Sequence, residues 1–152
     1  MVGGREGFAD LIAGAQPAAG IDYGYVVPGE AVVRPLAVFA RLTTSAVPGD
    51  RAGMLEFRSS DGQVYAVAGT DVTVGGASSA GFNYLAGLGE SMRPLGDVAM
   101  APMPRLVLWP TFQLAVRIVN GDAGDQLSGV RLMVERWTTE STPAAPATTA
   151  AP

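Results

Sequence analysis

Apolar and polar residues alternate with a period of two along three segments of the chain, and this alternation constrains the fold more than any other feature of the sequence. The segments are 36–42, Thr111–Val119 and Val130–Trp137. Their apolar faces consist of Leu36, Val38, Ala40 and Leu42; Phe112, Leu114, Val116 and Ile118; and Val130, Leu132 and Val134. Because successive side chains of a strand point to opposite faces, each segment is predicted to be a strand with one face on a core.

Shorter strands are predicted between these segments, separated by turn residues such as Pro28-Gly29, Asp61-Gly62 and Asn120-Gly121. The shorter strands are Ile21–Val27, Ala52–Arg58, Gln63–Ala68, Thr70–Val74, Gly81–Leu85 and Asp97–Met100. Asp61-Gly62 is expected to close a hairpin. Short strands at this spacing, with no long helix between them, indicate an all-β fold: an antiparallel β-sandwich or jelly roll.

The two ends of the chain differ from this middle part. Phe8, Leu11 and Ile12 stand at i, i+3 and i+4 ahead of Gly14, so the spacing predicts a short amphipathic helix. The last twelve residues, Ser141–Pro152, contain only Ser, Thr, Pro and Ala, which provide no core. We therefore expect an N-terminal helical arm over 1–20, a sandwich domain over 21–138 and an extended C-terminal tail over 139–152.

The chain contains no Cys, no His and no Lys, and its ten basic residues are all Arg. These absences argue against Cys/His zinc sites, His-dependent nucleophile pairs, Schiff bases and a P-loop lysine, so we expect no enzyme and no cofactor. A net charge of −4 argues against coating of nucleic-acid phosphates. No apolar run approaches the ~20 residues of a membrane helix, and no basic region precedes an apolar stretch, so neither a span nor a signal is expected.

Two segments and one pair of carboxylates suggest a binding or catalytic site, and each has a simpler explanation. Asn120–Asp125 has three oxygen-bearing side chains in six residues, as calcium loops do. An EF-hand loop that began at Asn120 would need a Glu at its twelfth position, which is Arg131, so a hairpin or long turn explains the segment better. Gly-rich Val74–Gly81 could form a phosphate cradle, yet it matches neither G-x-G-x-x-G nor a P-loop and has no basic residue, so a flexible connection between two strands is expected. Glu56 and Glu135 would suit a glycosidase only if they met, and both are expected on solvated strand faces.

Large apolar side chains outside the predicted core are the remaining candidates. Phe39, Met133 and Trp137 fall on faces opposite the core, and Trp109 stands beside a proline. Aromatic residues and Met are enriched in protein contact surfaces, so these residues form a predicted interface together with Phe8, Leu11 and Ile12 of the arm. The alternative is that the N-terminal arm covers the second face of one sheet and buries them.

A series of short motifs resembles small virion proteins of tailed phages that infect actinobacteria. The motifs are Val33-Arg34-Pro-Leu36, Leu42-Thr-Thr-Ser-Ala-Val47, Gly49-Asp-Arg51, Asp61-Gly62, Leu108-Trp109-Pro110, Gly124-Asp-Gln-Leu-Ser-Gly-Val130 and Val134-Glu-Arg-Trp137. They span about residues 30 to 138. The resemblance implies a jelly-roll structural protein of the particle, such as a capsid decoration (cement) or minor head protein.

Two functions from different classes follow. The first is a virion structural protein that binds the major capsid protein or other subunits and forms a homo-oligomer, a dimer or a trimer. The second is a head-tail connector or tail-associated module that binds carbohydrate or a host surface. With only eleven Phe, Trp and Tyr residues, the chain has few aromatic platforms to spare for sugar.

Overall fold

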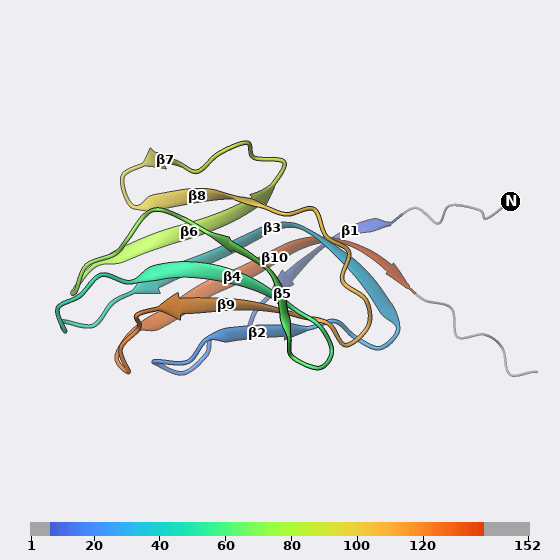
Figure 1. Cartoon of the computed structure of the whole chain (residues 1–152), viewed down its shortest axis with the longest axis horizontal. Helices are drawn as coiled ribbons and strands as arrows, with labels where there is room; N and C mark the ends of the chain where they lie inside the picture. The colour runs from blue at the N-terminus through green and yellow to red at the C-terminus, as the bar shows by residue number, and fades with distance from the viewer. Residues whose placement is uncertain (1–6, 139–152) are drawn as a thin grey trace, which may run out of the picture.

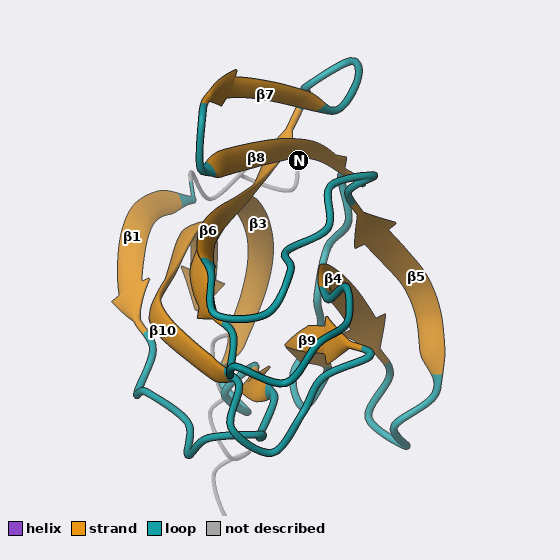
Figure 2. Ribbon diagram, turned by 90° about the vertical axis from the view of Figure 1, so that its left-hand side faces the viewer, coloured by secondary structure: helices purple, strands orange, loops and turns teal. Residues whose placement is uncertain are grey.

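Two β-sheets lie face to face and enclose the core between them (Figures 1 and 2). The computed structural model describes residues 7–138, apart from the side chains of residues 93–95. The strands in this range are β1 (Phe8–Ala13), β2 (Tyr23–Val26), β3 (Ala31–Thr43), β4 (Ala52–Arg58), β5 (Val64–Gly69), β6 (Ser79–Ala86), β7 (Met92–Leu95), β8 (Val98–Met103), β9 (Gln113–Val119) and β10 (Gln126–Thr138). The fold is thus a β-sandwich, as the alternation predicted.

The larger sheet has the order β1-β10-β3-β6-β8-β7, and the smaller has the order β2-β9-β4-β5. All neighbours pair antiparallel except β6 and β8, which run parallel. The two 13-residue strands, β3 and β10, pair with each other inside the larger sheet. In Figure 2, the larger sheet lies on the left and the smaller on the right, with β7 and β8 at the top.

The core confirms the three alternating segments. Val38 and Leu42 of β3, Leu114 of β9, and Leu132 and Val134 of β10 are all fully buried. The Asp61-Gly62 hairpin between β4 and β5 is also confirmed, with Gly62 at φ +85°, a conformation that glycine adopts without strain. Leu36 departs from the predicted face because the pairing of β10 with β3 shifts register between Met133 and Val134.

The predicted N-terminal helix is wrong. Residues Phe8–Ala13 form β1, which pairs with β10 from Phe8 opposite Arg136 to Ala13 opposite Arg131. The apolar spacing fits either structure, because Ile12 packs against the core while Leu11 is exposed, as alternate residues of a strand do. A helix of two turns is unstable alone, whereas the open edge of β10 offers a row of backbone hydrogen bonds.

Two other expectations also differ from the structure. The predicted strand Thr70–Val74 reduces to one bridge, between Val74 and Arg51. The short strand β7, Met92–Leu95, was not predicted, because its sequence Met-Arg-Pro-Leu contains a proline and shows no clear alternation. In the described range, no helix is long and apolar enough to cross a membrane.

Candidate functional site

A shallow groove of about 400 Å³ lies on the outward face of the six-stranded sheet. It is lined by Leu11, Phe39, Gly129, Arg131 and Met133, and three of these belong to the predicted interface. Strand register explains their meeting: Leu11 lies opposite Met133, and Phe39 lies opposite Arg131. The sheet therefore brings three strands, β1, β3 and β10, into one apolar surface.

A bulge in β10 shapes the floor of this groove. The pairing of β10 with β3 shifts register between Ser128 and Arg131, and Gly129 adopts φ +58°. Non-glycine residues adopt such a φ at a cost, so glycine fits this turn of the strand. A β-carbon at Gly129 would contact nothing within 4 Å, which shows that the space beside it is open.

The groove carries one charge. Three other arginines of the larger sheet are paired: Arg34 with Glu135 at 3.3 Å, Arg41 with Asp97 at 2.9 Å and Arg136 with Glu30 at 3.9 Å. Within the described residues, Arg131 has no carboxylate within ion-pair distance. The groove thus combines three apolar side chains, of which Leu11 and Met133 are about half exposed, with an unpaired guanidinium.

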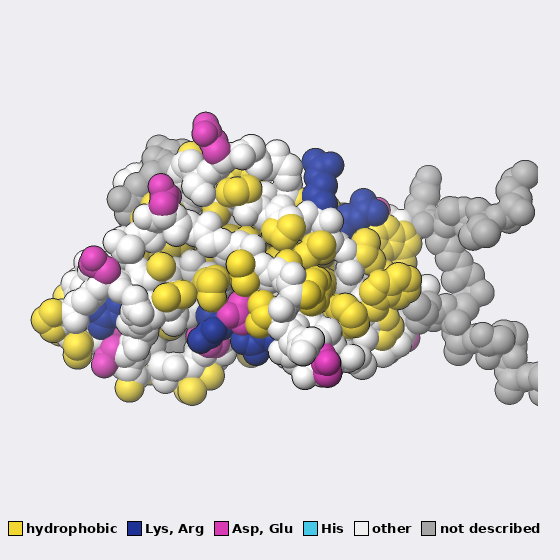
Figure 3. Space-filling view, in the orientation of Figure 1, with side chains coloured by type: hydrophobic (Ala, Val, Ile, Leu, Met, Phe, Trp, Pro, Cys, Tyr) yellow, Lys and Arg dark blue, Asp and Glu magenta, His cyan; other side chains and the backbone are white. Residues whose placement is uncertain are grey.

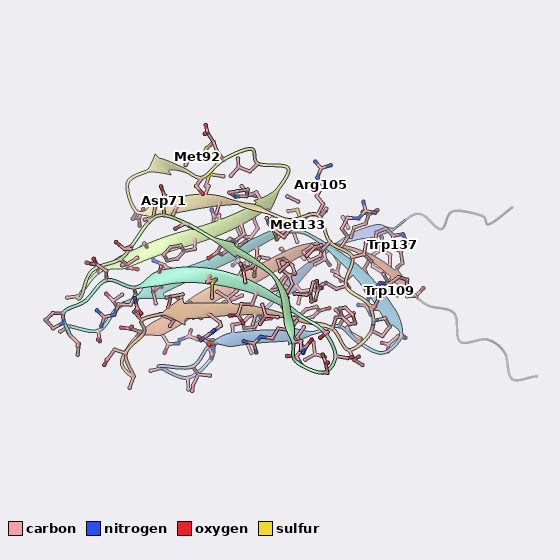
Figure 4. All side chains as sticks on the ribbon, viewed as in Figure 1. Asp71, Met92, Arg105, Trp109, Met133 and Trp137 are labelled. Atoms are coloured by element: carbon pink, nitrogen blue, oxygen red, sulfur yellow. The ribbon has the colours of Figure 1, made fainter. Side chains whose placement is uncertain are left out.

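The other predicted interface residues lie outside the groove. Ile12 packs against the core, and Phe8 is exposed near the start of the edge strand β1. Trp109 is 57% exposed in the connection between β8 and β9. The Cζ atom of Arg34 lies 5.1 Å from the centre of the Trp137 ring, in a cation–π arrangement. Figure 4 shows Trp109 and Trp137 toward one end of the sandwich, which agrees with the pairing of Leu108 and Trp137 to successive residues of β3.

The outward face of the smaller sheet holds an ion-pair cluster around Glu56. This carboxylate accepts hydrogen bonds from Arg117 at 2.8 Å and from Arg58 at 2.9 Å, and Arg117 also contacts Asp22 at 3.2 Å. Burial alone would raise the pKa of Glu56, but the hydrogen bonds and charges of Arg117 and Arg58 outweigh it and hold the pKa below its usual value. Glu56 is therefore ionised, and its role is structural. Figure 3 shows charged side chains in the middle of this face, with apolar ones around them.

The two carboxylates considered for a glycosidase belong to different sheets. Glu56 is on β4 and points outward from the smaller sheet, whereas Glu135 is on β10 and forms its ion pair with Arg34 on the larger sheet. Paired carboxylates of a glycosidase flank one bond at about 5–10 Å. Glu56 and Glu135 lie on the outward faces of two opposed sheets, so they are not arranged to flank one bond.

The segment Asn120–Asp125 is a turn between β9 and β10, as expected, and its carboxylates are used within the protein. Asp122 accepts from Ser45 Oγ at 3.0 Å and from the Gly124 N–H at 3.0 Å. Asp125 binds Arg51. No group of three or more metal-ligating side chains was found in the part of the chain that the structure describes.

Sequence reasoning missed the pair formed by Arg51 and Asp125. Both side chains are buried, and Asp125 also accepts hydrogen bonds from the backbone N–H groups of Ser45 at 2.8 Å and Asp122 at 2.7 Å. Burial alone would raise the pKa of Asp125, but these donors and Arg51 outweigh it and lower the pKa. Residues 74 positions apart carry no local pattern that reveals such a pair.

Comparison with known proteins gives no relative. No family model matches the chain, and neither the curated proteins nor the solved structures contain a match.

Proposed function

We propose that the chain is a non-enzymatic structural protein of a virion, a jelly roll that binds a neighbouring subunit of the particle. The motif resemblance points to a capsid decoration (cement) or minor head protein. The groove of Leu11, Phe39 and Met133 carries the proposal, because a solvent-facing apolar surface beside a cation that no described carboxylate pairs is typical of a contact surface.

The strand order supports the jelly-roll part of the proposal. A jelly roll has eight strands in two four-stranded sheets. When β7 and β8 are treated as an insertion between β6 and β9, the remaining strands form β1-β10-β3-β6 facing β2-β9-β4-β5. The one parallel pair, β6 with β8, then belongs to the insertion.

The chemistry of the groove defines the partner surface that fits it. Leu11, Phe39 and Met133 require an apolar side chain, and Arg131 favours a carboxylate beside that side chain. The major capsid protein, or another virion subunit, would present both on one loop or strand edge. The flexible Met133 side chain adapts its shape to such a contact at small cost.

A second candidate is favoured by a different observation. Trp109 is 57% exposed, and an exposed indole is a platform for a sugar ring. A connector or tail-associated module would use it to bind carbohydrate or a host surface. Titration of Trp109→Ala and the unsubstituted chain with host cell-wall fragments tests this: binding lost on substitution supports it, and no binding by either protein eliminates it.

The main proposal is tested in the particle itself. Mass spectrometry of purified virions of the phage that encodes the chain should detect it at a fixed stoichiometry. Purified protein added to particles that lack it should bind, and Leu11→Asp with Met133→Asp should abolish binding without unfolding the sandwich. Val47→Asp, which changes an exposed valine in a loop, is the matched control and should bind normally. Absence of the chain from virions, or normal binding by the double variant, overturns the proposal.

A further inference from the structure

Each sheet of the sandwich ends in two edge strands, and three of the four carry features that discourage pairing with another chain. β1 contains Asp10, β2 has only four residues, and β7 contains Arg93 and Pro94. Charges, shortness and proline are the devices by which proteins protect exposed strand edges. β5 has none of them: its sequence, Val-Tyr-Ala-Val-Ala-Gly, contains no charge and no proline.

Among the described side chains of the four edge strands, those of β5 include the largest number of exposed large apolar ones. Val64, Tyr65 and Val67 are 48%, 45% and 55% exposed. Among the described strands β5 pairs only with β4, and Figure 2 shows it at the right-hand rim of the molecule. An uncharged edge of six residues with unpaired backbone groups is a template for a further strand.

We propose that a second copy of the chain pairs with β5, antiparallel and across a two-fold axis, to join two four-stranded sheets into one of eight strands. The axis passes through Ala66, so that Tyr65 of each copy lies opposite Val67 of the other. This register pairs Tyr65 with Val67 twice across the axis, and aromatic–β-branched pairs of this kind stabilise neighbouring strands. Ala66, small and at the axis, lets the two strands approach.

Charge favours a second copy over a different partner. The nearest charged cluster, Glu56 and Asp22 with Arg58 and Arg117, pairs two carboxylates with two guanidiniums and requires no charged partner. The β5 edge itself is neutral, and a two-fold interface must match itself. The register brings Asp61 of one copy toward Asp71 of the other, so the dimer should tighten as salt screens this repulsion.

The absence of native cysteine makes the register directly testable. Ala66→Cys places the two thiols opposite each other at the axis, within the distance that a disulfide spans. Val64 lies two residues from the axis, so the two Val64→Cys thiols are four residues apart along the strands. At ~3.3 Å per residue this is roughly 13 Å, too far for a disulfide. Under mild oxidation Ala66→Cys should give a covalent dimer, and Val64→Cys should not. No dimer from Ala66→Cys, or equal dimer from both, overturns the proposal.

A charge exchange gives an independent measurement. Tyr65→Lys with Val67→Lys, and Tyr65→Glu with Val67→Glu, place like charges opposite each other in each homodimer, so we expect at least ~10-fold weaker association. A mixture of the two variants should restore dimers, because opposite charges then meet. Light scattering should give twice the chain mass of 15.6 kDa for the unsubstituted protein and the mixture, and the single mass for each variant alone.

This proposal does not depend on the virion function. The β5 variants should still bind particles through the groove, while Leu11→Asp with Met133→Asp should still dimerise. If the unsubstituted chain is still a monomer at roughly 100 μM, the proposed dimer is wrong. That result does not bear on the proposed contact through the groove. Dimerisation of both charge variants without mixing overturns the proposed β5 pairing equally.

Discussion

The guanidinium of Arg51 donates to the carboxylate of Asp125 over 3.0 Å, and both side chains are almost completely buried. Arg51 also donates to the carbonyl of Val47 at 2.8 Å, while Asp125 accepts from the Ser45 N–H. The pair thus ties the connection between β3 and β4 to the turn between β9 and β10. One end of the sandwich is closed by this contact between two loops, in a chain that has no disulfide.

Loss of either member of this pair should destabilise the fold strongly, because the other charge is then buried without compensation. We expect Arg51→Met or Asp125→Asn to lower the free energy of unfolding by about 3–5 kcal/mol. The double variant should recover part of this loss. Urea denaturation measures the effect, and Asp97→Asn, which breaks an exposed ion pair, should change stability by less than about 1 kcal/mol.

Stability should fall in acid because two buried carboxylates, Asp125 and Glu56, contribute to it only while they are ionised. The pKa values of Asp125 and Glu56 are lowered in the folded protein, so both stay ionised there at a pH that protonates them in the unfolded chain. Their contribution is present above the unfolded values of about 4 and is lost as pH falls through the folded values. The urea midpoint should therefore change little between pH 7 and 5 and drop below about pH 4. A midpoint constant down to pH 3 would contradict this.

Tyr84→Phe should stabilise the protein. The Tyr84 hydroxyl is buried and has no hydrogen-bond partner in the described structure, and burial raises its pKa. Removal of an unsatisfied buried hydroxyl recovers its desolvation cost, about 1 kcal/mol or more. Thermal unfolding should show a higher midpoint for Tyr84→Phe. A lower midpoint would mean that the hydroxyl has a partner, such as a buried water.

Strict alternation made the central strands predictable from the sequence. Along Gln113–Val119, Leu114, Val116 and Ile118 alternate and are all buried, although the small Ala115 on the other face is buried as well. β1 was mistaken for a helix because Phe8, Leu11 and Ile12 fit a helical spacing, and only the free edge of β10 decides between the two structures. The spacing of apolar residues within a segment does not show which strand edge elsewhere in the fold is free to pair with it.

The candidate site was predictable only in part. Phe39 and Met133 were identified because they fall on the outward faces of alternating strands, and Leu11 was identified under an incorrect helix. Arg131 and Gly129 were missed as site residues, because their role depends on a bulge that shifts the register of β10 against β3. The Arg51–Asp125 pair was missed for a similar reason, since it forms only when distant loops meet.

A comparison of two adjacent residues distinguishes the strand from the helix in solution. Ile12→Asp introduces an unpaired charge against the core and should cost at least ~2 kcal/mol, whereas Leu11→Asp faces solvent and should cost less than ~1 kcal/mol. Circular dichroism during urea denaturation gives both values. Equal costs for the two substitutions would argue against β1 as described.

Oxidation of Met133 tests the proposed contact most directly. Met133 lies in the groove and is 42% exposed, while Met92 on β7 is 43% exposed and lies outside the groove, so the two should react alike with peroxide in the free chain. In purified particles, mass spectrometry should show Met133 protected several-fold and Met92 unchanged. If Met133 oxidises in the particle as fast as it does in the free chain, the groove is not the surface that binds the neighbouring subunit.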